Sequence, residues 1–247
     1  MNPPARYLVC VVAGALAGFA VAWVARMPIA EAPAFPVTSS APTPTPSVAT
    51  QAAFERIYEN SEWGENDAGL GTSGSGSTVE ATAVYRAFLT QFMRDNDIHS
   101  VVDAGCGDWE FSQTIDWSGI HYKGFDIVPA VIARDKAQFG KPNIEFFHAD
   151  IVKTELPEAD LLLSKHVLQH LPSADIKTFL AQLPKFKHAL ITNGVSPRTF
   201  SARNVDIQAG AYRELDITQP PFGVAGSKVL SYWDGHHMHQ VVHVRRK

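Results

Sequence analysis

The sequence predicts an α/β protein built on a doubly wound, mostly parallel sheet. Three observations predict this fold class. Short strand-like runs recur along the chain, at 101–102, 121–125, 144–148, 161–163 and 189–192. Segments with helical periodicity separate several of these runs. The first three runs end at or beside Asp103, Asp126 and Asp150. Because right-handed crossovers align the carboxyl ends of parallel strands, these carboxylates are expected along one crevice.

The first run leads into a glycine turn, since residues 100–110 read S-V-V-D-A-G-C-G-D-W-E. Glycine suits Gly105 and Gly107 because the backbone there turns sharply or lets a ligand approach closely. A helix predicted over 111–117 would point free N–H groups at an anionic or carboxylate-bearing cofactor. A Gly-x-Gly turn can equally be a plain strand-to-helix connection. Asp126 favours the cofactor, because it lies where an acidic residue meets ribose hydroxyls in nucleotide sites.

Helices are predicted in four further segments. Apolar spacing favours a short helix over 52–63 and a longer one over 78–97, the latter begun by a capping box of Ser77 and Glu80. Pro129 suits the first position of a helix over 129–139. Ser173 is expected to cap a helix that ends near Leu183, and alternation favours a short strand over 212–217.

Four motifs between about Phe54 and Asn193 resemble the class I, Rossmann-like S-adenosylmethionine-dependent methyltransferases. They are V-V-D-A-G-C-G-D-W, G-F-D-I, F-H-A-D-I and L-L-L-S-K-H-V-L-Q-H-L-P. The resemblance implies a seven-stranded sheet with an antiparallel carboxyl-terminal hairpin, expected at 228–233 and 238–245. A dinucleotide dehydrogenase fits less well, because Glu110 stands where G-x-G-x-x-G needs glycine or alanine. Trp109 also departs from the family, which often has a third glycine there.

The resemblance implies S-adenosylmethionine as the cofactor and assigns residues to it. Asp103 would hold the amino group of its methionine part, Asp126 its ribose and Asp150 its adenine. The cofactor-binding set is Asp103, Ala104, Gly105, Gly107, Asp126, Ile127, Asp150, Ile151 and Ser164. Tyr58 and Trp63 are further candidates at its border. The loop over 69–77 is expected either to close over the methionine carboxylate or to serve as a plain linker.

His166 and His170 are the candidate catalytic residues if the acceptor must lose a proton. They follow the fourth strand together with Lys165 and Gln169, and on a helix the two histidines would share a face. Histidines at strand ends are more often packing residues. No metal is predicted, because H-E-x-x-H is absent and His237, His239 and His243 suit a polar strand face better than a metal site.

The amino-terminal segment divides into an apolar stretch and a tether. Residues 1–27 are long and apolar enough for a transmembrane anchor, although a cleaved signal segment and a start at Met27 are alternatives. Residues 28–51 are rich in Pro, Ala, Thr and Ser and predict a disordered linker, which leaves 52–247 for the domain. Flanking charges slightly favour an outside domain, whereas a cytosolic methyl donor favours a membrane-anchored domain on the cytoplasmic side.

Composition narrows the functional classes. A chain of 247 residues with net charge -4 lacks the electrostatic footprint of nonspecific nucleic-acid binding, so no nucleic-acid partner is expected. Cys10 and Cys106 are not expected to form a disulfide. The expected function is methyl transfer to an oxygen or nitrogen of a small-molecule acceptor. Alternatives are a membrane-tethered cofactor-binding or scaffold protein without transfer, and aminopropyl transfer from the same cofactor. The oligomeric state stays open.

Overall fold

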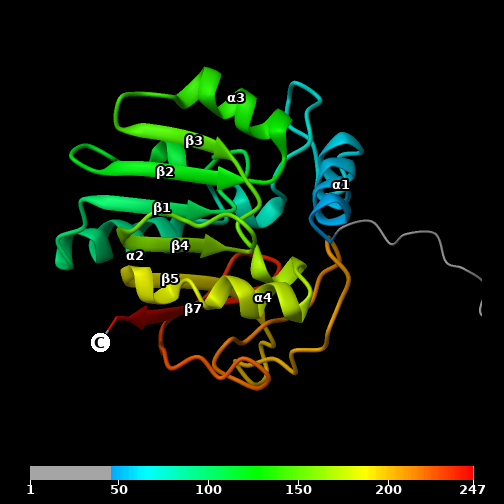
Figure 1. Ribbon diagram of the computed structural model, residues 1–247, viewed down its shortest axis with the longest axis vertical. Helices are drawn as coiled ribbons and strands as arrows, with labels where there is room; N and C mark the ends of the chain where they lie inside the picture. The colour runs from blue at the N-terminus through cyan, green and yellow to red at the C-terminus, as the bar shows by residue number, and fades with distance from the viewer. Residues whose placement is uncertain (1–45, 247) are drawn as a thin grey trace, which may run out of the picture. The chain divides into compact units, whose positions relative to one another are not determined.

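Seven strands form one mixed sheet in the computed structural model, which describes residues 46–246 (Figure 1). They are β1 (Ser100–Ala104), β2 (His121–Asp126), β3 (Ile144–His148), β4 (Ala159–Lys165), β5 (Phe186–Val195), β6 (Ser227–Trp233) and β7 (Met238–Arg245). Their order is β3-β2-β1-β4-β5-β7-β6, with β1 to β5 parallel and β7 antiparallel to both neighbours. The predicted doubly wound sheet and its antiparallel hairpin are confirmed, and the order reverses between β1 and β4.

The central strands are apolar because both faces of the sheet are covered. In β1 and β4, Val102 and Leu162 pack into one cluster, whereas Val101 and Leu161 pack into the cluster on the other side. The continuous apolar runs in the sequence reflect this burial on two faces.

Within residues 46–246, four α-helices pack around the sheet. They are α1 (Pro46–Glu59), α2 (Ala83–Asp95), α3 (Pro129–Phe139) and α4 (Ser173–Leu180). Helix α3 has the predicted bounds with Pro129 in its first turn, and α4 ends shortly before a 3-10 turn over Leu183–Lys185. Residues 46–51, expected in the linker, belong to α1. In Figure 1 the arrowheads of the parallel strands point toward α1, which places this helix at the edge where the carboxylates were expected.

The predicted capping box is wrong. Helix α2 begins at Ala83 after the cap residue Thr82, whereas Ser77 lies in a 3-10 turn over Ser75–Ser77. The Ser77 hydroxyl donates to the Ser73 carbonyl oxygen at 3.3 Å, and the Thr82 hydroxyl donates to the Thr78 carbonyl oxygen at 2.7 Å. Ser77 is therefore part of the preceding loop, and the residues up to Thr82 form turns instead of helix.

The expected strand over 212–217 is also absent, and irregular backbone occupies the segment. Arg213 explains how this backbone is held. Its buried guanidinium donates to the carbonyl oxygens of Leu171 and Val205, each at 2.6 Å. A side chain that satisfies backbone carbonyls in this way replaces the ladder that a strand would need.

The connection from β1 to β2 contains no α-helix, so the helix predicted over 111–117 is wrong. A single 3-10 turn over Ser112–Thr114 is present instead. Two tryptophans fill the space: the Trp117 ring lies 4.7 Å from Tyr122 and stacks on Trp109 at 6.5 Å between centroids. The Trp117 indole N–H donates to the Ser112 carbonyl oxygen at 2.8 Å. Trp109 has φ +56°, a conformation that interrupts a right-handed helix.

The predicted anchor at 1–27 and the first part of the predicted linker, 28–45, lie outside the described residues. Within residues 46–246, no helix combines the length and the apolar character that a bilayer crossing requires.

Replacing Trp117 tests whether aromatic packing substitutes for the missing helix. We expect Trp117→Ala to lower the free energy of unfolding by about 3–5 kcal/mol, because a 4% exposed aromatic side chain is lost. Trp117→Phe keeps much of the packing and loses one hydrogen bond, which costs about 1 kcal/mol. Urea unfolding followed by circular dichroism measures both.

Trp233→Ala is the matched control, because Trp233 is 53% exposed and its loss is expected to cost less than about 0.5 kcal/mol. Equal losses for Trp117→Ala and Trp233→Ala would contradict the structural role of Trp117.

Candidate functional site

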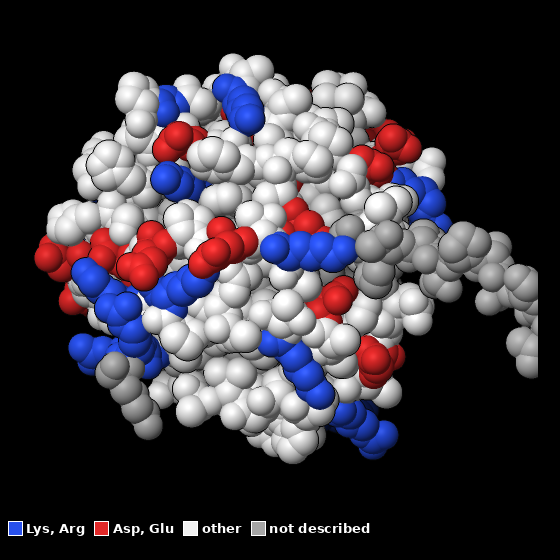
Figure 2. Space-filling view, in the orientation of Figure 1, with Lys and Arg blue, Asp and Glu red and all other residues white. Residues whose placement is uncertain are grey.

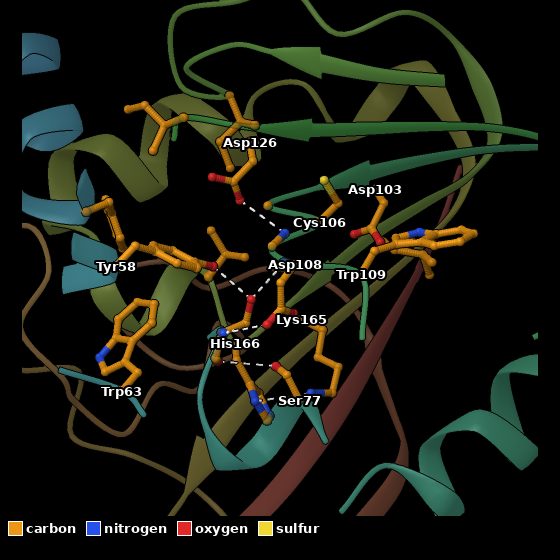
Figure 3. A pocket seen from close by; sticks show the side chains of 18 of the residues that line it. Tyr58, Trp63, Ser77, Asp103, Cys106, Asp108, Trp109, Asp126, Lys165 and His166 are labelled. Atoms are coloured by element: carbon orange, nitrogen blue, oxygen red, sulfur yellow. Dashed lines mark hydrogen bonds between the residues drawn. The ribbon is translucent and has the colours of Figure 1, made fainter. Parts of the chain in front are cut away.

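The carboxyl ends of β1, β2 and β4 and the segment after β3 open on one cavity. The volume of this cavity, including the open space at its entrance, is about 940 Å³. Of the residues expected at a cofactor or in catalysis, those lining it are Asp103, Gly105, Gly107, Asp126, Ile127, Asp150, Ile151 and His166, and the two border candidates Tyr58 and Trp63 also line it (Figure 3). The structure thus brings together residues from four separate strand ends.

Three predicted site residues do not line this cavity: Ala104, Ser164 and His170. Ala104 is fully buried within the core. The buried Ser164 hydroxyl has no hydrogen-bond partner among the described residues. His170 ends a 3-10 turn over Leu168–His170, where its Nδ1 lies 3.0 Å from the Ala211 carbonyl oxygen and its ring 4.8 Å from Trp63. Burial lowers the pKa of His170 to about 4, so the imidazole is neutral.

The glycine turn after β1 is shaped by contacts within the chain. Gly105 and Gly107 have φ of +86° and +58°. A Cβ on Gly105 would overlap the Val167 side chain, and one on Gly107 would overlap the Ser73 hydroxyl. The Gly107 N–H donates to Asp126 Oδ2 at 3.1 Å. Since no α-helix follows the turn, the expected anion site at a helix N-terminus is not formed.

The loop over 72–77 covers the glycine turn through a reciprocal pair of hydrogen bonds. The Ser73 N–H donates to Asp108 Oδ2 at 3.0 Å, and the Asp108 N–H donates to Ser73 Oγ at 2.9 Å. The Tyr58 hydroxyl lies 2.7 Å from the same Ser73 oxygen. These contacts attach the loop to both α1 and the turn, so it forms one wall of the cavity (Figure 3).

Two buried carboxylates face the cavity from neighbouring strands. Asp126 accepts hydrogen bonds from the N–H groups of Gly107 and Val128, and burial raises its pKa despite them. Asp103 accepts the Tyr122 hydroxyl at 2.7 Å, and burial raises its pKa to about 6. Both groups sit where a ligand with hydroxyl or amino donors could replace lost hydration.

Lys165 at the end of β4 also lines the cavity, although the sequence analysis did not select it. Its Nζ donates to the Gly76 carbonyl oxygen at 2.7 Å and lies 3.2 Å from His166 Nδ1. Burial lowers the pKa of Lys165 to about 7. The sequence signal that could have identified it is a lysine at the end of an apolar strand, two residues past Leu163, which pairs with Asp103.

The His166 ring packs against a second histidine ring at a tilt. Its ring centroid lies 4.1 Å from that of His239, whose Nε2 is 2.6 Å from Asp234 Oδ2. His243 instead contacts His188, with Nε2 and Nδ1 2.9 Å apart. Among residues 46–246 no group of three His, Cys, Asp or Glu side chains is arranged to hold a metal ion.

Comparisons with known proteins agree with this architecture. Residues 101–186 match a family model described as a methyltransferase domain. Uncharacterized methyltransferases of Mycobacterium tuberculosis and Mycobacterium bovis are 33% identical over 85 residues, which is 34% of this chain and 42% of theirs. The chain therefore spans less than half the length of these relatives.

Two solved structures have the same fold. Magnesium protoporphyrin IX methyltransferase from Synechocystis is 13% identical with a TM-score of 0.58, covering 84% of this chain and 100% of that one. The 1,6-didemethyltoxoflavin-N1-methyltransferase of Burkholderia thailandensis is 18% identical with a TM-score of 0.59, covering 84% and 92%. Residues 101–186 are therefore similar to a methyltransferase domain, and the described residues share the fold of these two methyltransferases. Both findings agree with the resemblance to class I S-adenosylmethionine-dependent methyltransferases.

Adding a methyl group at Gly107 tests whether a glycine is needed there so that the Ser73 side chain can pack against the turn. We expect Gly107→Ala to lower the free energy of unfolding by about 2–3 kcal/mol, through left-handed backbone strain and overlap with Ser73. Hydrogen exchange over 72–77 should rise, because the bonds between Ser73 and Asp108 are strained. Urea unfolding and hydrogen-exchange mass spectrometry measure the two effects.

Gly119→Ala separates the cost of left-handed backbone strain from the cost of steric overlap with Ser73. Gly119 has φ +76° and nothing within 4 Å of an added Cβ, so only the backbone cost of about 1–2 kcal/mol applies. If both variants lose equal stability and exchange over 72–77 is unchanged, the overlap with Ser73 has no consequence.

Proposed function

We propose that this chain transfers the methyl group of S-adenosylmethionine to an oxygen or nitrogen of a small-molecule acceptor. The observation that carries the proposal is the cavity at the carboxyl ends of β1, β2 and β4, since it gathers Asp103, Gly105, Gly107 and Asp126 in one place. Ligands of open α/β sheets bind at this edge, next to the point where the strand order reverses.

The residues present fit the chemical groups of this methyl donor. Five carboxylate residues line the cavity, and three of them, Asp103, Asp126 and Asp150, lie at or just after strand ends and suit amino and hydroxyl donors. Ile127 and Ile151 supply apolar surface for the purine ring. The carboxylates would repel a pyrophosphate, which favours this donor over a dinucleotide.

In this assignment, one carboxylate at or just after the end of each of β1, β2 and β3 binds one part of the methyl donor. Asp103 holds the amino group of the methionine part, Asp126 accepts from the ribose hydroxyls, and Asp150 accepts from the adenine amino group. When bound, S-adenosylmethionine supplies an electrophilic methyl carbon on a sulfonium. The chain contributes mainly orientation of the two reactants, and the loop over 72–77 limits access of water from one side.

Support for a small acceptor comes from the surface and from the structural relatives. Figure 2 shows Lys and Arg interspersed with Asp and Glu on the visible described surface, without the basic stripe typical of nucleic-acid binding. The names of the two similar enzymes specify a magnesium porphyrin and a didemethyltoxoflavin as methyl acceptors.

A cytosolic methyl donor further favours the cytoplasmic side for the domain, if the amino-terminal segment is a membrane anchor. His166 is favoured over His170 as a group near the acceptor, because only His166 lines the cavity.

Calorimetric titration of S-adenosylmethionine and S-adenosylhomocysteine into the full chain tests the proposal. We expect both ligands to bind, and Asp126→Ala to weaken both by about 10- to 100-fold, because hydrogen bonds to a charged group are lost. Asp95→Ala on the exposed side of α2 is the matched control and should leave both affinities unchanged.

Near-UV circular dichroism of the Asp126 variant distinguishes a lost site from a lost fold. Absence of binding by the unaltered chain would falsify the methyl-transfer function. Binding without transfer to any acceptor in a screen with labelled methyl donor would favour a cofactor-binding protein.

A further inference from the structure

We propose that Lys165 accepts the proton that the methyl acceptor loses, and that His166, His239 and Asp234 position it for this step. The inference rests on the proposed methyl transfer and goes beyond it, because it assigns the base and restricts the acceptor to compounds that carry a removable O–H or N–H proton.

The location of Lys165 supports this role. It is the last residue of β4, the strand next to β1, and it lines the same cavity as Asp103 while only 9% exposed. A buried lysine at the carboxyl edge of a parallel sheet lies where ligands of this fold bind. Figure 3 shows its side chain beside those of Ser77 and His166 at the wall of the cavity.

The hydrogen bonds of Lys165 match those of a neutral amine. A neutral amine has two N–H donors and one lone pair, whereas an ammonium has three donors. Nζ has two polar contacts, the Gly76 carbonyl oxygen at 2.7 Å and His166 Nδ1 at 3.2 Å. When His166 carries its proton on Nε2, both contacts are acceptors and use both donors of the amine, which leaves its lone pair for a third partner in the cavity.

No carboxylate of the described residues forms an ion pair with Nζ. Burial lowers the pKa of Lys165 to about 7, and the negative charges of Asp234, Asp103 and Asp108 limit this decrease. The rings of Phe111 and Tyr85 lie with their centroids 5.1 and 5.8 Å from Nζ. These groups would stabilise the ammonium once it forms, without holding it permanently charged. The titratable groups facing Lys165 are thus Asp103, Asp108, Asp234, Tyr85, His166 and, packed against the His166 ring, His239.

The histidine pair positions Lys165. His166 Nδ1 accepts from Nζ only in its neutral form, and burial together with Lys165 and His239 lowers the pKa of His166 well below its usual value. The His239 ring packs against that ring with 4.1 Å between centroids, and Asp234 Oδ2 lies 2.6 Å from its Nε2. Gly76 of the 72–77 loop packs against His166, which links the loop to the same cluster.

The proton step balances in atoms and charge. An O–H or N–H bond of the acceptor breaks, and an N–H bond forms at Nζ. The electron pair left on the acceptor atom forms the bond to the methyl carbon, whose former bonding pair remains on sulfur. One positive charge therefore appears on Lys165 as one disappears from the sulfonium, and the charge of the cavity is conserved.

Proton release on ligand binding tests the proposal without a known acceptor. We would titrate S-adenosylmethionine and S-adenosylhomocysteine into the full chain at pH 7, in buffers of different ionisation enthalpy. The sulfonium disfavours an ammonium nearby, so its binding should release about half a proton more than binding of the neutral thioether. Protons released from Asp103 cancel in this difference, because both ligands carry the same amino group.

Lys165→Met should abolish the difference between the two ligands, and Lys177→Met, a change on the exposed side of α4, should preserve it. The lysine side-chain NMR resonance missing from Lys165→Met provides a second measurement in the unaltered chain. It should titrate near pH 7, far below an exposed lysine.

The outcomes separate the two proposals. Failure of both ligands to bind overturns the proposed function and this assignment with it. Binding of both ligands with equal proton release, a difference that survives in Lys165→Met, or a Lys165 resonance that titrates above pH 9 overturns the assignment of Lys165 alone.

Discussion

The site depends on the hydrogen bonds that join the glycine turn to two distant segments, the end of β2 and the loop before α2. Buried backbone N–H groups need partners, and no helix follows β1 to organise them. Asp126 receives the Gly107 N–H, and Ser73 receives the Asp108 N–H. Because these partners come from β2 and from the loop before α2, the turn cannot form without closing the wall of the cavity. The glycine at 107 is needed for this closure whatever ligand is bound.

Burial of several ionisable groups in one cavity sets its chemistry. Burial raises the pKa values of Asp103 and Asp126 and lowers that of Lys165, so each group is driven toward its neutral form. A ligand that carries positive charge and hydrogen-bond donors reverses this for the carboxylates, because it stabilises their ionised form. The same ligand further disfavours an ammonium at Lys165. A positively charged methyl donor therefore favours the ionised form of Asp103 and Asp126 and the neutral amine form of Lys165.

The sequence predicted those features that are encoded locally. Apolar runs located the strands because burial on two faces is visible in the run itself, and Pro129 located the start of α3. Features that depend on distant contacts were missed. The burial of Lys165 requires Gly76, 89 residues away, and Ser77 looked like a helix cap because its loop partners are not evident from spacing. His166 and His170 were paired by a helical spacing that the 3-10 turn over 168–170 does not follow.

Trp109 shows how the chain tolerates a departure from the family pattern next to its glycine turn. A bulky residue there could have filled the space of the methionine part. Its φ is +56°, and its indole packs into the cluster around Trp117, Phe139 and Phe146, where its exposed fraction is 3%, while the residue also lines the cavity. The same conformation prevents a helix from starting after the turn. Trp109 therefore borders both the aromatic cluster and the cavity, and Gly105 and Gly107 line the cavity beside it although no α-helix follows the turn.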